Sequence, residues 1–203
     1  MIKIFHSFTT LIRMAVFAAV SLTACTDHVD PDTSSPAFKI AQALALPVPA
    51  AVALPANPNG NSPVAVYFAE GVQRYKAQEK LYSYPTSYEW VFVEPEADLF
   101  AVSNAKVGRH FGGPSWTVDA TNSLIVGQQF SPAKTTNVDP QHIDWLLLMP
   151  KTGTIPNGRF QETDYIQRIA TKGGRAPVVP PGNALETVDV PYTAVYIFSK
   201  INP

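Results

Sequence analysis

The residues best suited to chemistry lie around His110, in a glycine-rich segment. Arg109 precedes the histidine, and Gly112-Gly113-Pro114 separates it from Trp116. An imidazole beside a guanidinium and an indole could hydrogen-bond a small ligand, and it could also act as a base. With Arg168 from a later segment, these residues form the predicted ligand-binding set: Arg109, His110, Trp116 and Arg168. The pattern also suits a histidine at a strand end whose ring bonds a neighbouring carbonyl, so a structural role stays open.

His142 and Asp144 are two positions apart and would share one face of a strand, where both could reach a metal ion. A metal site usually needs three or four converging ligands, and His110 is the only further histidine in the predicted domain. We therefore predict no metal and no cofactor, and interpret His142 as part of an exposed turn. Arg168 follows Asp164 by four residues, about 13 Å along a strand, so we expect it to pair with a carboxylate on a neighbouring strand.

Two further charged segments have alternative interpretations. Lys172-Gly173-Gly174-Arg175 could form a nest of backbone amides that binds an anion, or a tight turn between strands. Glu94, Glu96 and Asp98 surround Pro95, which suits a solvated acidic turn or, with more oxygen ligands, a calcium loop. Neither Gly-x-Ser-x-Gly nor His-Glu-x-x-His occurs, the spacings typical of serine hydrolases and zinc proteases. No catalytic residue is predicted from local motifs.

The only cysteine follows a segment with the order of a bacterial secretion signal. Two basic residues precede the run Met14–Leu22, which carries no charge and is too short to span a bilayer. The run ends in Leu22-Thr23-Ala24-Cys25, which resembles the lipobox of bacterial lipoproteins. We therefore predict a signal peptide over residues 1–24 and acylation of Cys25, with chains such as palmitate, as the membrane anchor.

The lipobox resemblance also implies a location. Thr26, rather than an aspartate, follows the cysteine, which in Gram-negative lipoproteins implies sorting to the outer membrane. We expect the protein in the bacterial cell envelope, touching the membrane through the lipid on Cys25, with residues 25–46 as the lipidated cysteine and a tether. Removing residues 1–24 leaves 13 of the 15 basic residues beside 16 acidic ones, with no basic stripe. Nucleic acid is therefore not an expected partner.

Residues 47–203 are predicted to form a single, mostly β domain. Runs rich in β-branched and aromatic residues alternate with turn formers, as is typical of an antiparallel β-sandwich or barrel with long loops rich in proline and glycine. In the last run the even-numbered residues 192–198 would face one side and Val195 and Ile197 the other, so we expect a strand covered on both faces. The expected strands are Val64–Ala69, Val72–Lys76, Tyr88–Val93, Leu99–Val102, Ser115–Val118, Ser123–Gln129, Ile143–Leu148, Asp164–Ala170 and Tyr192–Ser199.

Four segments are similar to those of one known family: Val107–Trp116, Asp144–Leu148, Tyr165–Pro177 and Val190–Tyr196. They include Val-Gly-Arg-His-Phe-Gly-Gly-Pro-Ser-Trp and Val-Pro-Tyr-Thr-Ala-Val-Tyr. Together they resemble a family of secreted bacterial and fungal proteins classed as a domain of unknown function, over about residues 47–199. The resemblance supports the fold and the compartment, and it carries no known activity.

The same resemblance implies that two distant segments lie close in space. Many members have a cysteine shortly after the tyrosine matching Tyr75 and another after the pair matching Ala176-Pro177, and this chain has neither. If the two cysteines form a disulfide in relatives, their joint loss here is consistent with proximity of the two segments.

Three functions are compatible with these patterns. The first, which we favour, is a non-enzymatic domain that binds a small molecule or an envelope-derived ligand near the predicted set. The second is a hydrolase-type enzyme, which requires a hydroxyl or carboxylate within hydrogen-bond reach of His110 in a cleft. The third is a structural or partner-binding envelope protein, which would expose an apolar patch instead of a pocket.

Overall fold

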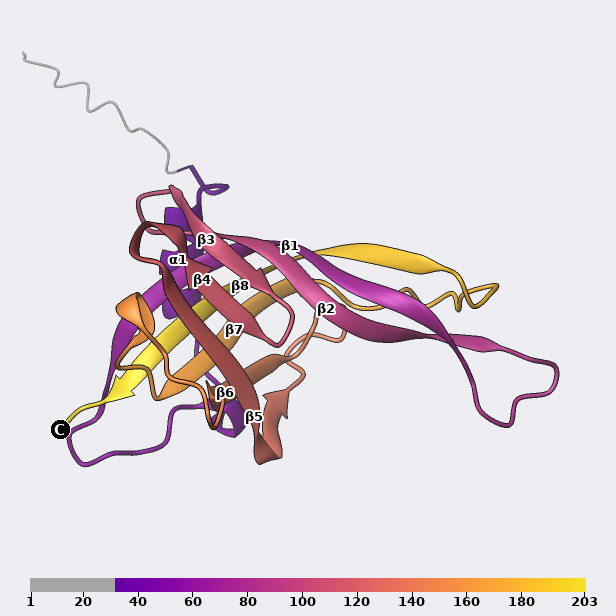
Figure 1. Ribbon diagram of the computed structural model, residues 1–203. Coiled ribbons are helices and arrows are strands. Elements are labelled where there is room, and N and C mark those ends of the chain that lie inside the picture. The colour runs from indigo at the N-terminus through magenta and orange to yellow at the C-terminus, as the bar shows by residue number, and fades with distance from the viewer. Residues whose placement is uncertain (1–31) are drawn as a thin grey trace, which may run out of the picture. The chain divides into compact units, whose positions relative to one another are not determined.

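The computed structural model describes residues 32–203, and Figure 1 shows their arrangement. The predicted signal peptide, Cys25 and the first part of the predicted tether lie outside the described residues. Among residues 32–203, no helix has the length and hydrophobicity that crossing a membrane would need. The elements in chain order are α1 (Pro36–Leu44), η1 (Ala50–Val52), β1 (Asn61–Glu79), β2 (Tyr88–Phe100), β3 (Lys106–Phe111), β4 (Ser115–Val118), η2 (Asp119–Thr121), β5 (Ser123–Thr136), β6 (Trp145–Pro150), η3 (Gly158–Phe160), β7 (Tyr165–Gly173) and β8 (Thr187–Ile201).

The eight strands form one closed antiparallel barrel. Each strand pairs with the next along the chain, and β1 also pairs with β8, which closes the ring. The predicted mostly β, antiparallel fold is confirmed, and of the two predicted architectures the barrel is the one observed. In an up-and-down order every connection joins neighbouring strands, so the sheet has no free edge within the ring.

Two pairs of predicted strands are single long strands in the structure. The expected breaks at Gly71 and Pro95 are absent, because both residues are paired inside the β1–β2 ladder. Gly71 is required there, since a Cβ at this position would collide with the carbonyl oxygen of Glu96. Strand β3 was not predicted, because its sequence was interpreted as a glycine-rich loop. Gly108 instead lets β3 approach β4 closely, where a Cβ would meet the carbonyl of Thr117.

Apolar residues form two buried clusters, one on each face of the barrel wall. The first lies inside the barrel and includes the large rings of Trp116, Phe160, Tyr196 and Phe198. The second lies outside the wall, where α1 and η1 cover it. Strand β8 contributes to both clusters, because its even-numbered residues 192–198 point inward and its odd-numbered ones outward. The prediction that this strand is covered on both faces is confirmed.

Helix α1 is positioned by its capping residue and one apolar face. The Ser35 hydroxyl accepts a hydrogen bond from the Phe38 amide at 3.3 Å, and Pro36 occupies the first turn, where no amide donor is needed. Ile40 and Ala43, three residues apart, are buried against the barrel. These residues lie in the stretch expected to be a tether, so the packed part of the chain begins ahead of Pro47.

Parts of β1, β2 and β8 continue past the barrel as a three-stranded extension, called the arm below. It consists of residues 72–79 of β1, 88–96 of β2 and 187–191 of β8. In Figure 1 the arm projects away from the barrel, and the connection between β7 and β8 runs in the same direction. The Trp90 indole donates a hydrogen bond to the carbonyl of Val179 at 2.9 Å, which ties this connection to the arm.

Candidate ligand-binding cavity

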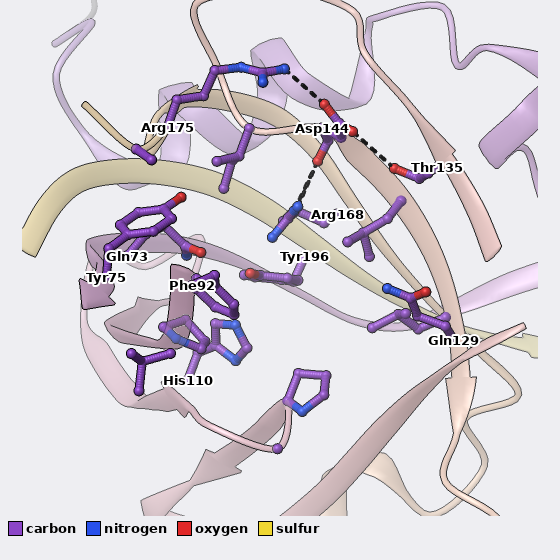
Figure 2. Close-up of a pocket in the computed structure, with 18 of the residues that line it drawn as sticks. Gln73, Tyr75, Phe92, His110, Gln129, Thr135, Asp144, Arg168, Arg175 and Tyr196 are labelled. Carbon is purple, nitrogen blue, oxygen red and sulfur yellow. Dashed lines mark hydrogen bonds and ion pairs between the residues drawn. The ribbon is translucent and has the colours of Figure 1, made fainter. Parts of the chain in front are cut away.

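A cavity of about 860 Å³ lies in the barrel on the side where the arm begins. Its inner lining is buried and includes Gln73, His110 and Trp116. Its outer lining includes Phe92 and Val178, which are exposed. The cavity therefore runs from the barrel interior to the surface. Figure 2 shows residues of β1, β2, β3, β7 and β8 pointing into it. This volume lies within the range of small-molecule sites in proteins.

His110 is held in one orientation at the base of the cavity. It faces inward because residues alternate along β3, and it is only 2% exposed. Its Nδ1 lies 2.9 Å from the carbonyl oxygen of Ser115, so Nδ1 carries the proton and donates, and Nε2 keeps a lone pair. Burial is the main cause that lowers the pKa of His110 to about 3; the nearby Arg168 charge acts in the same direction, and the hydrogen bond to Ser115 opposes them. The imidazole is neutral at neutral pH.

An aromatic cluster forms the wall beside His110. The imidazole stacks on the Trp116 indole, with ring centroids 4.5 Å apart and planes 8° apart. The two residues are direct cross-strand partners in the β3–β4 ladder, which sets this geometry. The Tyr196 ring packs against both, with centroid distances of 4.8 Å and 5.2 Å. These rings form the buried, inner part of the cavity lining.

Three buried polar groups that line the cavity have no hydrogen-bond partner among the described residues. They are the Gln73 amide nitrogen, the Trp116 indole nitrogen and the Tyr196 hydroxyl. The Gln73 and Tyr196 groups lie close to the Tyr192 hydroxyl, and Tyr196 also lies close to Arg168, without the geometry of a full hydrogen bond. Trp116 and Tyr196 are at most 1% exposed. A buried polar atom without a partner costs about 1–3 kcal/mol, so such atoms are few in proteins. All three residues belong to the cavity lining, and the atoms themselves are shielded from solvent.

Arg168 brings a positive charge to the same cavity. Its Nε and Nη2 both donate to the backbone carbonyl of Asp144, at 3.1 Å and 2.8 Å. The expected carboxylate partner is therefore wrong, because the Asp144 carboxylate is engaged elsewhere, by Arg175 at 3.0 Å and Asn137 at 2.8 Å. Figure 2 shows Arg168 between Asp144 and Tyr196. Arg168 and Tyr196 are partners in the β7–β8 ladder, which places them together.

Comparison with known proteins identifies the family. The family described as Protein of unknown function (DUF3455) matches residues 58–200. The chain belongs to this family. The matched range begins just before β1 and reaches the end of β8, so it contains the barrel and the lining of the cavity. The predicted family resemblance is confirmed. Neither a curated protein nor a solved structure matches the chain.

The DUF3455 barrel brings together the two segments expected to be neighbours from the cysteine pattern of relatives. The Tyr75 hydroxyl donates to the carbonyl of Gly174 at 2.6 Å. Tyr75 and Ala176 both line the cavity. This hydrogen bond links the arm, which contains Tyr75, to the chain that leaves β7 at Gly174. The two segments are therefore joined here without a disulfide.

Three of the four predicted ligand-binding residues line the cavity of the DUF3455 domain: His110, Trp116 and Arg168. Arg109 points to the outer face of β3 and pairs with Glu96 at 3.0 Å. It lines a separate, smaller hollow on the outside of the barrel.

The acidic residues around Pro95 lie in strand β2, so the expected turn is wrong. Alternate strand positions place them on one outer face, where basic residues meet them. Arg74 contacts Glu94 at 3.6 Å and Glu96 at 3.2 Å, and Lys106 contacts Asp98 at 2.8 Å. They form an ion-pair network on the outside of the wall.

The Gly-Gly segment after β7 differs from both of its predicted forms. The Gly173 amide donates to Nδ1 of His142 at 3.0 Å, and the Gly174 amide donates to the carbonyl of Pro191 at 2.9 Å. Both amides are therefore engaged within the protein. The pair ends β7 and begins the 13-residue connection 174–186, so it is not a tight turn. Both glycines have positive φ, +67° and +80°, which explains the choice of residue.

His142 and Asp144 have separate partners in the DUF3455 domain. His142 accepts from Gly173, and Asp144 binds the Arg175 guanidinium. Within residues 32–203, no group of three or more histidine, cysteine, aspartate or glutamate side chains is placed to hold a metal ion.

Several residues of the cavity were not found from the sequence. Gln73 and Tyr75 come from β1 and Tyr196 from β8, while Phe92 and Gln129 lie nearer the mouth. One signal was present. Gln73 lies in a run where alternate residues are apolar, and an amide on an inward strand face indicates a special role. Tyr196 was assigned to the covered strand, but the pattern alone did not indicate that its face borders a cavity.

Proposed function

We propose that this chain is a bacterial envelope lipoprotein whose barrel binds a small molecule in the cavity at His110, Trp116 and Arg168. The observation that carries the binding proposal is a cavity that reaches the surface and is lined by apolar and aromatic side chains together with the Arg168 guanidinium. Apolar surface with a few placed polar groups is typical of small-molecule sites.

The experiment is native mass spectrometry of the protein purified without unfolding from its own membrane. We expect a mass in addition to the acylated chain, which is released when the protein is denatured. Gln129→Trp, at the cavity mouth, should abolish the additional mass because the indole fills the entrance. Leu124→Trp is the matched control, since Leu124 lies on the same strand, is exposed and does not line the cavity. Absence of any additional mass from the unaltered protein would contradict the proposal.

The lipoprotein part of the proposal is supported by the segment Leu22-Thr23-Ala24-Cys25 and its place behind an apolar run. Metabolic labelling with an alkyne analogue of palmitate tests it. The unaltered chain should take up the label and fractionate with the outer membrane, and Cys25→Ala should do neither. Label that persists in Cys25→Ala, or an unlabelled native chain, would refute the lipid anchor.

The hydrolase alternative finds less support. Within residues 32–203, the one hydrogen bond of the His110 ring is to the backbone carbonyl of Ser115, and no hydroxyl or carboxylate bonds it. With its pKa lowered to about 3 by burial, the imidazole is a weak base at neutral pH. Both observations favour binding over proton transfer.

A second candidate function, binding of a partner protein, is favoured by the surface of the arm. The turn between β1 and β2 exposes Leu81, Tyr82 and Tyr84, each more than 80% accessible. The connection between β7 and β8 adds exposed Val178 and Leu185. Large apolar side chains gathered at one end of a molecule are typical of interaction surfaces. Replacing Tyr82 and Tyr84 with serine should abolish cross-linking to a partner in intact cells and leave ligand binding unchanged.

A further inference from the structure

The charges that line the cavity do not balance. Arg168 and Arg175 are both part of the lining, and Asp144 is the only carboxylate among the described lining residues. Asp144 forms its ion pair with Arg175, at 3.0 Å. Arg168 is held by a backbone carbonyl, which fixes its direction without neutralising its charge. The half-buried cavity wall therefore carries one positive charge that no described carboxylate of the lining matches.

The neighbouring polar groups also favour an electron-rich ligand. The indole nitrogen of Trp116 can only donate a hydrogen bond, and it is fully buried without an acceptor among residues 32–203. The amide nitrogen of Gln73 is a second buried donor in the same situation. His110 adds no charge, because burial keeps its imidazole neutral at neutral pH. Two residues with buried donors and one cation thus belong to the lining of the same cavity.

The remaining walls are flat and apolar. The lining includes the stacked rings of His110 and Trp116, the ring of Tyr196, and Tyr75 and Phe92, which pack edge to face at 5.7 Å. In Figure 2 Arg168 lies near Tyr196. Aromatic walls favour planar apolar groups through offset or edge-to-face contacts.

We propose that the cavity selects small amphipathic monoanions, with a carboxylate at Arg168 and a flat apolar body against the aromatic side chains of the lining. This inference rests on the proposed binding function and adds the chemical class of the ligand. The guanidinium supplies a charge-assisted hydrogen bond to the carboxylate, and the buried donors supply neutral ones. A neutral molecule of the same shape would leave the Arg168 charge unmatched and bind more weakly.

Isothermal titration with two probes tests this inference on the full chain in detergent, with detergent-only titrations subtracted. The probes are 2-naphthoate and 2-naphthamide, which share a ring system and differ in charge. We expect naphthoate to bind at least tenfold more tightly than naphthamide at pH 7.5. Arg168→Gln should remove this preference by weakening naphthoate at least tenfold, and should leave naphthamide within threefold of its original affinity.

Two variants control for effects on the fold. Arg168→Lys retains the charge, so it should retain the preference for naphthoate even if its unfolding midpoint falls. Arg109→Gln makes the same charge change on the outer face of β3, away from the cavity, and should alter neither affinity by more than twofold.

Equal affinity of the two probes for the unaltered chain would overturn the selection of anions and leave the binding function standing. Failure of both probes to bind would overturn the ligand class, whereas the binding function is overturned only if native mass spectrometry also finds no additional mass. A naphthoate preference that survives in Arg168→Gln would show that Arg168 is not the anion site.

Discussion

Replacing His110 with asparagine should remove a pH dependence of stability that the unaltered protein shows. The asparagine amide can still donate to the Ser115 carbonyl, where Nδ1 of the imidazole donates at 2.9 Å, but it does not titrate. The loss of the ring from its stack on Trp116 will destabilise the variant at every pH. The informative quantity is therefore how the difference in free energy of unfolding between the two proteins changes with pH.

The magnitude follows from the pKa of His110, which burial lowers from 6.5 to about 3 in the folded protein. Between these values the unfolded chain binds a proton at this position and the folded chain does not. The free energy of unfolding therefore falls as the pH falls below 6.5, by about 1.4 kcal/mol per pH unit. From pH 7.5 to pH 5.0 the loss attributable to His110 is about 2 kcal/mol.

Urea unfolding followed by tryptophan fluorescence at four pH values between 7.5 and 5.0 measures this loss. The unaltered protein should lose about 2 kcal/mol more than His110→Asn over this range. Carboxylates contribute equally to both proteins and cancel in the difference. Asp189, whose pKa is lowered by its hydrogen bond to Arg74, is one of them. If the free energy of unfolding of both proteins falls by the same amount over this range, the His110 imidazole is not buried in its neutral form. Its assigned hydrogen bond, from Nδ1 to the Ser115 carbonyl, would then be wrong.

Three substitutions test the packing by the same urea assay. Ile40→Ala should destabilise the protein by about 2–5 kcal/mol, because the Ile40 side chain packs α1 against the barrel. A change under about 0.5 kcal/mol would show that α1 is part of the tether. Gly173→Ala should destabilise the protein more than Gly153→Ala. Both glycines have positive φ, but only at Gly173 would the new Cβ collide with the Pro191 carbonyl oxygen. Equal losses of unfolding free energy would contradict the close approach of Gly173 to Pro191. Tyr84→Ser should change stability by less than about 0.5 kcal/mol, since its side chain is fully exposed, and a larger loss would mean that the arm packs on something.

The sequence predicts those parts of the fold that depend on local alternation. Ser115–Val118 was predicted with the observed bounds, because both of its ends carry turn residues. The two faces of β8 were predicted because its side chains alternate between aromatic and aliphatic types. The continuity of β1 through Gly71 was not predicted, because glycine within a run of strand residues usually indicates a break. Here the backbone of Glu96 lies so close that only glycine fits, and the sequence does not show this contact. Closure of β1 on β8 joins the two ends of the domain, and no local pattern encodes it.

The cavity was predicted only in part for a similar reason. His110 and Trp116 are six residues apart and meet as a cross-strand pair, so their proximity follows from one hairpin. Arg168 and Tyr196 join them from β7 and β8, and this depends on the closed ring. Arg109 was included because it adjoins His110 in the sequence. On a strand, adjacent residues point to opposite faces, and once β3 is recognised as a strand Arg109 must face outward.

The two-sided burial of β8 has a consequence for how this chain can change length. Inserting or deleting one residue before Tyr196 would exchange its inward and outward side chains, moving aromatic rings under α1 and aliphatic ones into the barrel. Such an insertion or deletion would disrupt both clusters at once. We therefore expect β8 to tolerate substitution of a residue better than a change in its length. The turn between β1 and β2, with solvent around Tyr82 and Tyr84, carries no such constraint. Length variation in this barrel is therefore expected to gather at the tip of the arm.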